Sequence, residues 1–182
     1  MNIKIIDENG IDVGCLRRDL AVKYGLRHQI ASVLIYSDTD HTVLLQRRNE
    51  KKNSCPGMWD KSAGGHVDAH EDSISAVIRE TKEELGISLI QNELKLLGKY
   101  NTDDKLTDGY LRRQTLDFIY NTKPKKLKII IQPEELEQVE WVKIYELKKI
   151  LTTDKLNPKY KSHDLTKGLI RALNLLIIDL KL

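Results

Sequence analysis

The sequence predicts a single α/β domain, and three observations support that prediction. Short apolar runs bounded by turn residues recur along the chain, as expected for strands. A central segment and a C-terminal segment instead carry apolar residues at helical spacing. With 182 residues, of which 40% are hydrophobic and 31% charged, the chain suits one domain, 1–182, with a sizeable core.

The first part of the chain predicts two strand pairs with a short helix between them. Asn9-Gly10 is a strong hairpin signal inside the N-terminal hairpin 3–13. A short helix is expected next, and then two apolar strands joined by a polar turn. The ranges are 17–24 for the helix and 30–36 and 42–46 for the strands.

The second part predicts three strands and two helices around the central helix. A loop with a Pro-Gly turn is expected at 53–57, ahead of the central helix. After that helix, strands are expected at 94–100, 110–120 and 139–142. Helices are expected at 144–151 and at about 163–180. The last helix carries leucines at helical spacing, which fit packing on the core or a homodimer face, and we expect a homodimer.

The central segment 65–87 concentrates acidic residues on one helix face. At about 100° per residue, Glu80, Glu83 and Glu84 fall in one narrow sector. Another sector is apolar and fit for burial; it contains Ile74, Val77, Ile78, Thr81 and Leu85. Because three clustered carboxylates need neutralisation, this face predicts a cation site.

Three features favour Mg²⁺, with Mn²⁺ as a substitute. Carboxylate oxygens suit these hard cations, which keep other positions for water and phosphate oxygens. The acids lie in the C-terminal half of the helix, where added negative charge is destabilising. Arg79 precedes Glu83 by four residues and can orient it through an ion pair, while Asp72 is the expected N-cap.

These residues resemble the Nudix box, Gly-x5-Glu-x7-Arg-Glu-U-x-Glu-Glu-x-Gly-U, where U is aliphatic. The matching positions are Gly65, Glu71, Arg79, Glu80, Glu83, Glu84, Gly86 and Ile87. The single departure is Thr81 at an aliphatic position, where a β-branched residue is nearly isosteric with valine. The resemblance implies the Nudix fold, an α/β/α sandwich around a mixed β-sheet.

The flanking sequence is similar to the Nudix branch that contains isopentenyl-diphosphate isomerase. The similar segments include Arg27-His28, Pro56-Gly57-Met58-Trp59-Asp60 and Ser62-Ala63-Gly64-Gly65-His66. That isomerase has a catalytic cysteine where this chain has Gly64, which argues against isomerisation. It uses positions matching His28 and His66 as metal ligands, so the resemblance makes these two a possible second metal site.

The resemblance implies hydrolysis of a diphosphate in a nucleoside diphosphate linked to another moiety, or in a similar small molecule. Glu80 and Glu84 are then expected to bind Mg²⁺ directly. Glu83 is expected as a further ligand or as the base, and Arg79 is expected to position Glu83. A base from the following loop is an alternative; the candidates are Glu134, Glu135, Glu137 and Glu140.

Substrate contacts lie outside the box. Candidates are Arg47, Arg48 and His66, with Arg112 and Arg113 as further basic residues, because arginine suits phosphate. Trp59 is expected in the core instead. Two alternatives to hydrolysis stay open: isopentenyl-diphosphate isomerisation, and a Nudix module that binds nucleotides without cleaving them.

Composition limits the other classes of function. A net charge of +3 is too small to predict a nucleic-acid partner. No apolar run approaches a membrane span, no signal peptide is visible, and Cys15 and Cys55 are expected to be free thiols. We therefore expect a cytoplasmic enzyme without a membrane partner.

Overall fold

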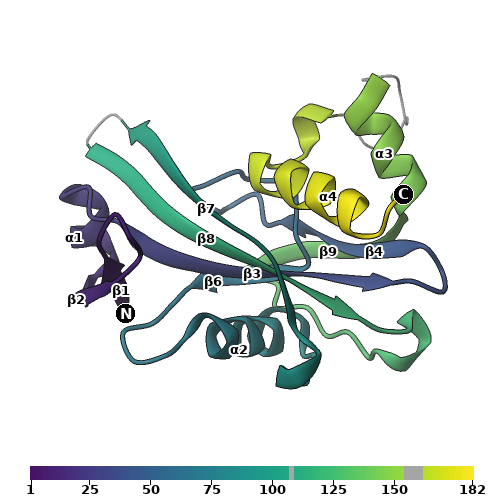
Figure 1. Ribbon diagram of the computed structural model, residues 1–182, viewed down its shortest axis with the longest axis horizontal. Helices are drawn as coiled ribbons and strands as arrows, with labels where there is room; N and C mark the ends of the chain where they lie inside the picture. The colour runs from purple at the N-terminus through teal and green to yellow at the C-terminus, as the bar shows by residue number, and fades with distance from the viewer. Residues whose placement is uncertain (107–108, 154–161) are drawn as a thin grey trace.

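The computed structural model describes residues 1–106, 109–153 and 162–182, and in these it has a nine-stranded sheet between helices (Figure 1). The strands are β1 (Asn2–Ile6), β2 (Asp12–Arg17), β3 (His28–Ser37), β4 (Thr42–Arg48), β5 (Trp59–Asp60), β6 (Ala63–His66), β7 (Lys95–Leu106), β8 (Gly109–Asn121) and β9 (Leu136–Lys143). The helices of more than one turn are α1 (Arg18–Lys23), α2 (Ser73–Leu85), α3 (Ile144–Thr153) and α4 (Lys167–Asp179).

Strand β3 is the centre of the sheet. It runs parallel to β8, from the pair His28↔Arg113 to the pair Tyr36↔Asn121. It runs antiparallel to β1, β4 and β6, and β7 extends the sheet antiparallel to β8. The mixed sheet implied by the family resemblance is therefore confirmed.

The sheet forks beside β3. The first half of β3 pairs with β6, and its last residues pair with β4 instead. The hydroxyl of Ser62 lies in the gap, where it accepts from the backbone N–H of Ile35 at 2.8 Å and donates to the carbonyl of Leu44 at 2.5 Å. One serine thus satisfies both backbone groups that the fork leaves unpaired.

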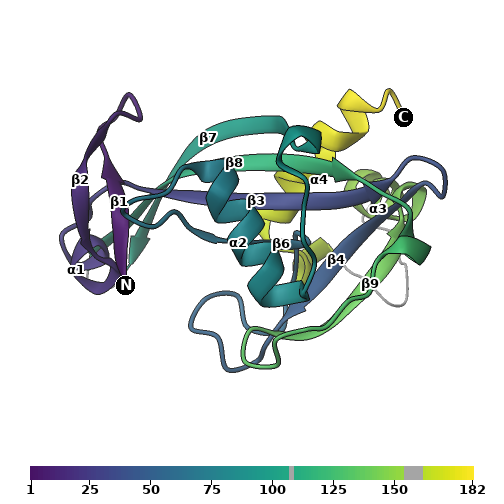
Figure 2. The ribbon, with the colours of Figure 1, turned by 90° about the horizontal axis from the view of Figure 1, so that it is seen from below.

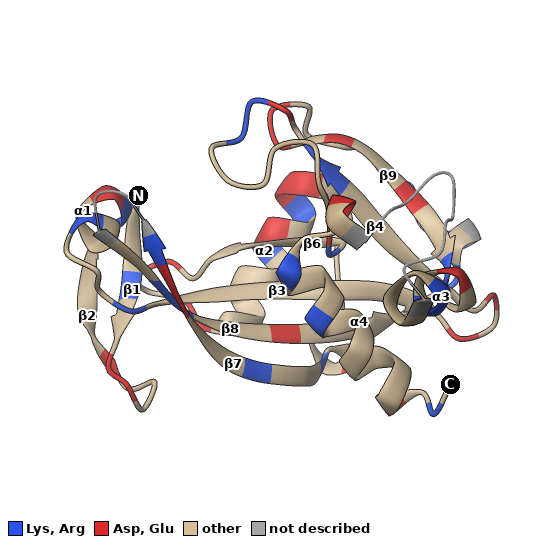
Figure 3. Cartoon of the chain, turned by 90° about the horizontal axis from the view of Figure 1, so that it is seen from above, with Lys and Arg blue, Asp and Glu red and all other residues tan. Residues whose placement is uncertain are grey.

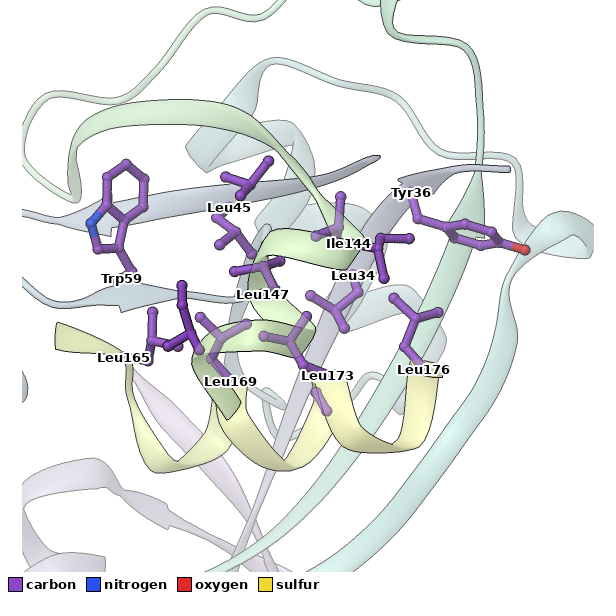
Figure 4. Packing of buried hydrophobic residues seen from close by; sticks show 14 of the residues in the cluster. Leu34, Tyr36, Leu45, Trp59, Ile144, Leu147, Leu165, Leu169, Leu173 and Leu176 are labelled. Carbon is purple, nitrogen blue, oxygen red and sulfur yellow. The ribbon is translucent and has the colours of Figure 1, made fainter. Parts of the chain in front are cut away.

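Alternate residues of β3 face two separate cores. Ala31, Val33 and Ile35 are buried under α2, which covers one face of the sheet (Figure 2). Leu34 and Tyr36 point to the other face, where leucines of α3 and α4 pack on them (Figure 4). Helices thus cover both faces, which confirms the α/β/α sandwich.

Three expectations about local structure need correction. Helix α4 begins at Lys167, because the Thr166 side chain caps it and a separate turn occupies 162–164. The first hairpin has a longer loop than Asn9-Gly10, since the Asp7 carboxylate accepts from the backbone of both Asn9 and Ile11. Strand β6 was not predicted, because its sequence Ala-Gly-Gly-His lacks β-formers.

The leucines of the C-terminal segment pack within the chain. Leu165, Leu169, Leu173 and Leu176 are all buried in the core between α3, α4 and the sheet. This packing accounts for them without a second copy, and the homodimer stays a prediction. None of the helices in the described residues is long and apolar enough to span a membrane. Cys15 and Cys55 are free, as expected.

Candidate active site at the edge of strand β6

Helix α2 has the boundaries and the two faces that its sequence predicts. The Asp72 side chain accepts from the backbone N–H of Ser75 at 2.7 Å, and Gly86 ends the helix at φ 69°. Val77, Thr81 and Leu85 are buried against the sheet. The Thr81 hydroxyl donates to the Val77 carbonyl at 2.7 Å, so it is satisfied inside the apolar face.

Arg79 organises the acidic residues of the box. Its guanidinium contacts Glu71 at 2.6 Å, Glu80 at 2.9 Å and Glu83 at 3.1 Å. It also donates to the main-chain carbonyl of His66 at 3.1 Å, which ties α2 to β6. The predicted pair with Glu83 is confirmed. Through the further contacts with Glu71 and Glu80, one guanidinium bridges three carboxylates of the box.

Glu84 is the most deeply buried carboxyl group of the box. Its side chain accepts from the backbone N–H of Gly64 at 3.2 Å. Burial, reinforced by the nearby Glu80 carboxylate, raises the pKa of Glu84 to about 8. Burial also raises the pKa of Glu80, against the opposing charge of Arg79. Glu84 therefore lies in a desolvated position without an ion pair of its own among the described residues, whereas Glu80 is held by Arg79.

Two adjacent glycines connect β6 to the helix and to the sheet. A Cβ on Gly65 would lie 2.1 Å from a carboxylate oxygen of Glu80, so this position admits the acidic group. A Cβ on Gly64 would lie 2.5 Å from the Cβ of Ser32 and 2.8 Å from the Ala31 carbonyl. A cysteine therefore does not fit at residue 64 without displacing β3.

The acidic face of α2 fits a divalent cation by its chemistry. Its donors are carboxylate oxygens. The carboxyl groups of Glu80 and Glu84 are strongly desolvated, and the side chain of Glu83 is 52% exposed. Within the described ranges no three His, Cys, Asp or Glu side chains are grouped closely enough to hold a metal ion. Arg79 forms ion pairs with both Glu80 and Glu83 in this structure, so the assignment of these two residues as metal ligands stays a prediction.

Arg47 and Arg48 hold the loop 49–57 to the end of the sheet. Arg47 donates to the Gly57 carbonyl at 2.9 Å and pairs with Glu137 at 3.3 Å. Arg48 donates to the Ser54 carbonyl at 3.0 Å and pairs with Asp60 at 3.5 Å. These contacts give both arginines a structural partner, and their predicted contact with substrate remains untested.

The predicted loop acids lie at different distances from the box. Glu135 pairs with Lys52, and its charge helps to raise the pKa of Glu84, so it lies close to the acidic face. Glu137 is engaged by Arg47 instead. Asp60 also acts on Glu84 and accepts from the Thr166 hydroxyl at 2.8 Å. The sequence does not predict Asp60 as a site residue, because only the sheet register brings it near Glu84.

His28 and His66 lie together on the face of the sheet opposite α2. Their rings stack at 5.2 Å between centroids and 22° between planes. Burial, with nearby arginine charges, lowers the pKa of both, that of His66 to about 3. Both are therefore neutral at physiological pH, and no acidic side chain completes a metal site around them within the described residues.

A buried ion pair lies on the same face and was also missed. The Nζ of Lys61 contacts Asp117 at 2.7 Å, and the Ser32 hydroxyl donates to the same carboxylate oxygen at 2.5 Å. Burial alone would lower the pKa of Lys61, but the charges of Asp117 and Asp60 outweigh it and raise that pKa. No sequence motif joins these residues, which are 56 positions apart.

Comparison with known proteins agrees with the geometry of α2 and its loops. The model of the NUDIX domain matches residues 26–163. The chain belongs to the Nudix family. Its similarity to Nudix hydrolase 3 of Arabidopsis thaliana is 30% identity over 141 residues, which cover 75% of this chain and 18% of that protein. The chain thus spans less than a fifth of that relative.

Other members of the Nudix family include isomerases and nucleotide-binding domains. The isopentenyl-diphosphate Delta-isomerase of Dinoroseobacter shibae is 31% identical over 123 residues, which cover 68% of each protein. A Deinococcus radiodurans structure superposes with a TM-score of 0.70 at 19% identity and covers 96% of this chain and 98% of that one. The NUDIX domain of Shewanella oneidensis NrtR, complexed with ADP ribose, has a TM-score of 0.57 at 15% identity and covers 85% of this chain and 86% of that one.

Proposed function

We propose that this Nudix protein is a divalent-metal-dependent hydrolase. Its substrate would be a nucleoside diphosphate linked to another moiety, or a similar organic diphosphate, cleaved at the diphosphate bond. The observation that carries the proposal is the position of the buried Glu84 carboxyl group beside Glu80, where burial and the Glu80 charge raise the pKa of Glu84 to about 8 and a bound cation would lower it again. The complete box supports it, since all three clustered glutamates are present.

Each residue of the box has a separate role in this proposal. Glu80 and Glu84 would hold Mg²⁺ or Mn²⁺, which neutralises phosphate charge and activates water when bound. Glu83, exposed and paired with Arg79, would complete the ligands or accept the proton of the attacking water. Glu135, close to Glu84 and paired with Lys52, is the alternative proton acceptor from the loop.

Isomerisation is the competing function, because isomerases are among the relatives that match most of this chain. Two observations favour hydrolysis. The residue at position 64 is glycine, and the space around it does not admit a cysteine side chain. The box glutamates are complete and are organised by one arginine. A binding module without catalysis would not need this complete set.

A substrate screen tests the proposal. Purified protein would be incubated with nucleotide sugars, dinucleoside polyphosphates, NADH, deoxynucleotides and isoprenyl diphosphates, with Mg²⁺ or Mn²⁺, and phosphate-containing products would be measured. We expect metal-dependent cleavage of at least one diphosphate and loss of it in Glu84→Gln. Conversion of isopentenyl diphosphate to its isomer would support the isomerase, and metal binding without any turnover would support a binding module.

A further inference from the structure

Strand β1 precedes the residues matched by the NUDIX domain, yet it lies against the box loop (residues 67–72), which leads from β6 into α2. The backbone N–H of Lys4 donates to the Val67 carbonyl at 3.0 Å. The backbone N–H of Ala69 donates to the Asn2 carbonyl at 3.1 Å. These bonds place the start of the box loop beside β1 (Figure 2).

The side chain of Lys4 extends this contact from the backbone to the charges of the box. Lys4 is the only charged residue of β1 (Figure 3). Its Nζ donates to the main-chain carbonyl of Glu71 at 2.5 Å. The Glu71 carboxylate pairs with Arg79 at 2.6 Å. Arg79 pairs in turn with Glu80 and Glu83, so one series of polar contacts joins β1 to two of the clustered glutamates.

Apolar packing does little to hold the box loop against the hairpin. The hairpin has a small core of its own, which contains Ile3, Ile5 and Ala21 and is separate from the two cores beside the sheet. A cavity of about 610 Å³ opens between Met1, Asn2 and residues 68–71. Because little apolar surface joins these parts, each polar contact has a large share in fixing the loop.

We propose that Lys4 is a positioning residue for the acidic face of α2 and acts through Glu71 and Arg79. This inference rests on the proposed function, because that face would hold the metal ion. The Lys4 Nζ fixes the main chain at Glu71, and the Glu71 carboxylate then fixes Arg79. Without that donor, the carboxylates that Arg79 contacts would be less preorganised for a cation.

Lys4→Met tests the proposal, because it removes the donor and keeps most of the apolar stem of the side chain. We expect Mn²⁺, titrated calorimetrically without substrate, to bind about tenfold more weakly, as is typical when a residue behind the metal ligands is lost. With a cleaved diphosphate, kcat should fall by a similar factor and KM should stay nearly the same, because the proposal gives Lys4 no contact with substrate. Lys4→Arg keeps a donor and should restore most of both losses.

The side chain of Arg79 provides a readout that a general loss of stability would not change. Its Nε–H donates to Glu71 at 3.2 Å. In nitrogen-15 NMR spectra of the metal-free protein, recorded below the unfolding temperature, this Nε–H signal should shift in Lys4→Met and return in Lys4→Arg. Should Lys4→Met fail to fold, Lys4→Gln is the second variant, because its shorter side chain does not reach the Glu71 carbonyl, and the same shift is expected.

Lys143→Met is the matched control. The Nζ of Lys143 also donates to a main-chain carbonyl, that of Asp40 at 2.8 Å, in the turn between β3 and β4. Asp12→Asn is a second control, because it removes the carboxylate that lies 3.9 Å from the Lys4 Nζ and leaves the bond to Glu71 in place. Both variants should keep the wild-type Mn²⁺ affinity. An equal loss of affinity in Lys143→Met would show a general effect of losing such a bond and would overturn the proposal.

The Mn²⁺ and NMR measurements do not depend on hydrolysis, so they separate this inference from the proposed function. Unchanged Mn²⁺ affinity in Lys4→Met would overturn the positioning role, and an unchanged Arg79 signal would overturn the route through Glu71. Absence of cleavage with every substrate, together with weaker Mn²⁺ binding in Lys4→Met, would reject the proposed function and leave the positioning role standing.

Discussion

Two neighbouring residues of β6 serve opposite faces of the sheet, and the two faces differ in how their polar groups are satisfied. Gly65 faces α2, where Arg79 pairs with three carboxylates. His66 faces His28, whose buried Nε2 has no hydrogen-bond partner among the described residues. The α2 face therefore gathers its charges around one arginine, whereas the opposite face buries polar groups away from solvent.

The largest effect should come from Glu84→Gln. Loss of a metal-binding carboxylate removes several kcal/mol of transition-state stabilisation, so kcat should fall by about 1000-fold. The fold should survive, because burial already favours the neutral form of this side chain. Steady-state kinetics with thermal melting as the control would check both. Retention of full activity would separate the α2 face from the chemistry.

The second largest effect concerns stability on the opposite face. Lys61→Met leaves Asp117 as a buried charge without its partner, which should cost about 3–5 kcal/mol in the free energy of unfolding. The double variant Lys61→Met/Asp117→Leu should recover most of that loss, because both charges are gone. Urea denaturation of the three proteins measures this. A free energy of unfolding close to the wild-type value in Lys61→Met would mean that water already solvates the Lys61–Asp117 pair.

A smaller effect is expected at the fork. Gly64→Cys introduces a Cβ that meets β3 at 2.5 Å, so it should destabilise the fold by about 1–3 kcal/mol and should not create isomerase activity. Gly168→Ala is the matched control, since its Cβ would have no neighbour nearer than 3.6 Å and alanine favours a helix. Isomerisation by Gly64→Cys, assayed on isopentenyl diphosphate, would contradict this account.

The smallest effect, counted per pH unit, is the pH dependence of metal binding. The pKa of Glu84 is about 8 in the fold against 4.5 as its ordinary value, so the metal-free fold favours the protonated group and loses stability as pH rises between these values. Mg²⁺ must displace that proton. Its affinity should therefore rise by up to about tenfold per pH unit until pH reaches about 8.

Calorimetry of Mg²⁺ binding at several pH values checks this, with Glu84→Gln as the control whose weaker binding should lack the same slope. An affinity that does not change with pH in the wild type would show that Glu84 does not lose a proton to the metal. The α2 face would then act through Glu80 and Glu83 alone.

The sequence predicts much of the fold and of the α2 face because their signals are local. Helix α2 follows from apolar spacing and from its caps at Asp72 and Gly86, and the pair of Arg79 with Glu83 follows from a four-residue offset. Most strands extend a few residues beyond their predicted ends. Those residues, such as Lys143, gain their pairing from neighbouring strands rather than from local propensity.

The opposite face was not predictable, because its partners meet only through sheet register. Ser32 lies on β3, Asp117 lies on β8 and Lys61 lies between β5 and β6, and no spacing in the sequence relates them. Strand β6 was not predicted for a similar reason. Its glycines, Gly64 and Gly65, allow close approach to Ser32 and Glu80, and that requirement comes from tertiary contacts rather than from strand propensity. The C-terminal helix was predicted too long because the Thr166 cap was overlooked.

Cleavage of a diphosphate in water labelled with oxygen-18 tests the central claim most directly. We expect the label to enter a phosphate-containing product of the cleaved diphosphate, with a requirement for Mg²⁺ or Mn²⁺, and we expect Glu84→Gln to abolish this incorporation. Substrate isomerised with its diphosphate intact and unlabelled would contradict the account.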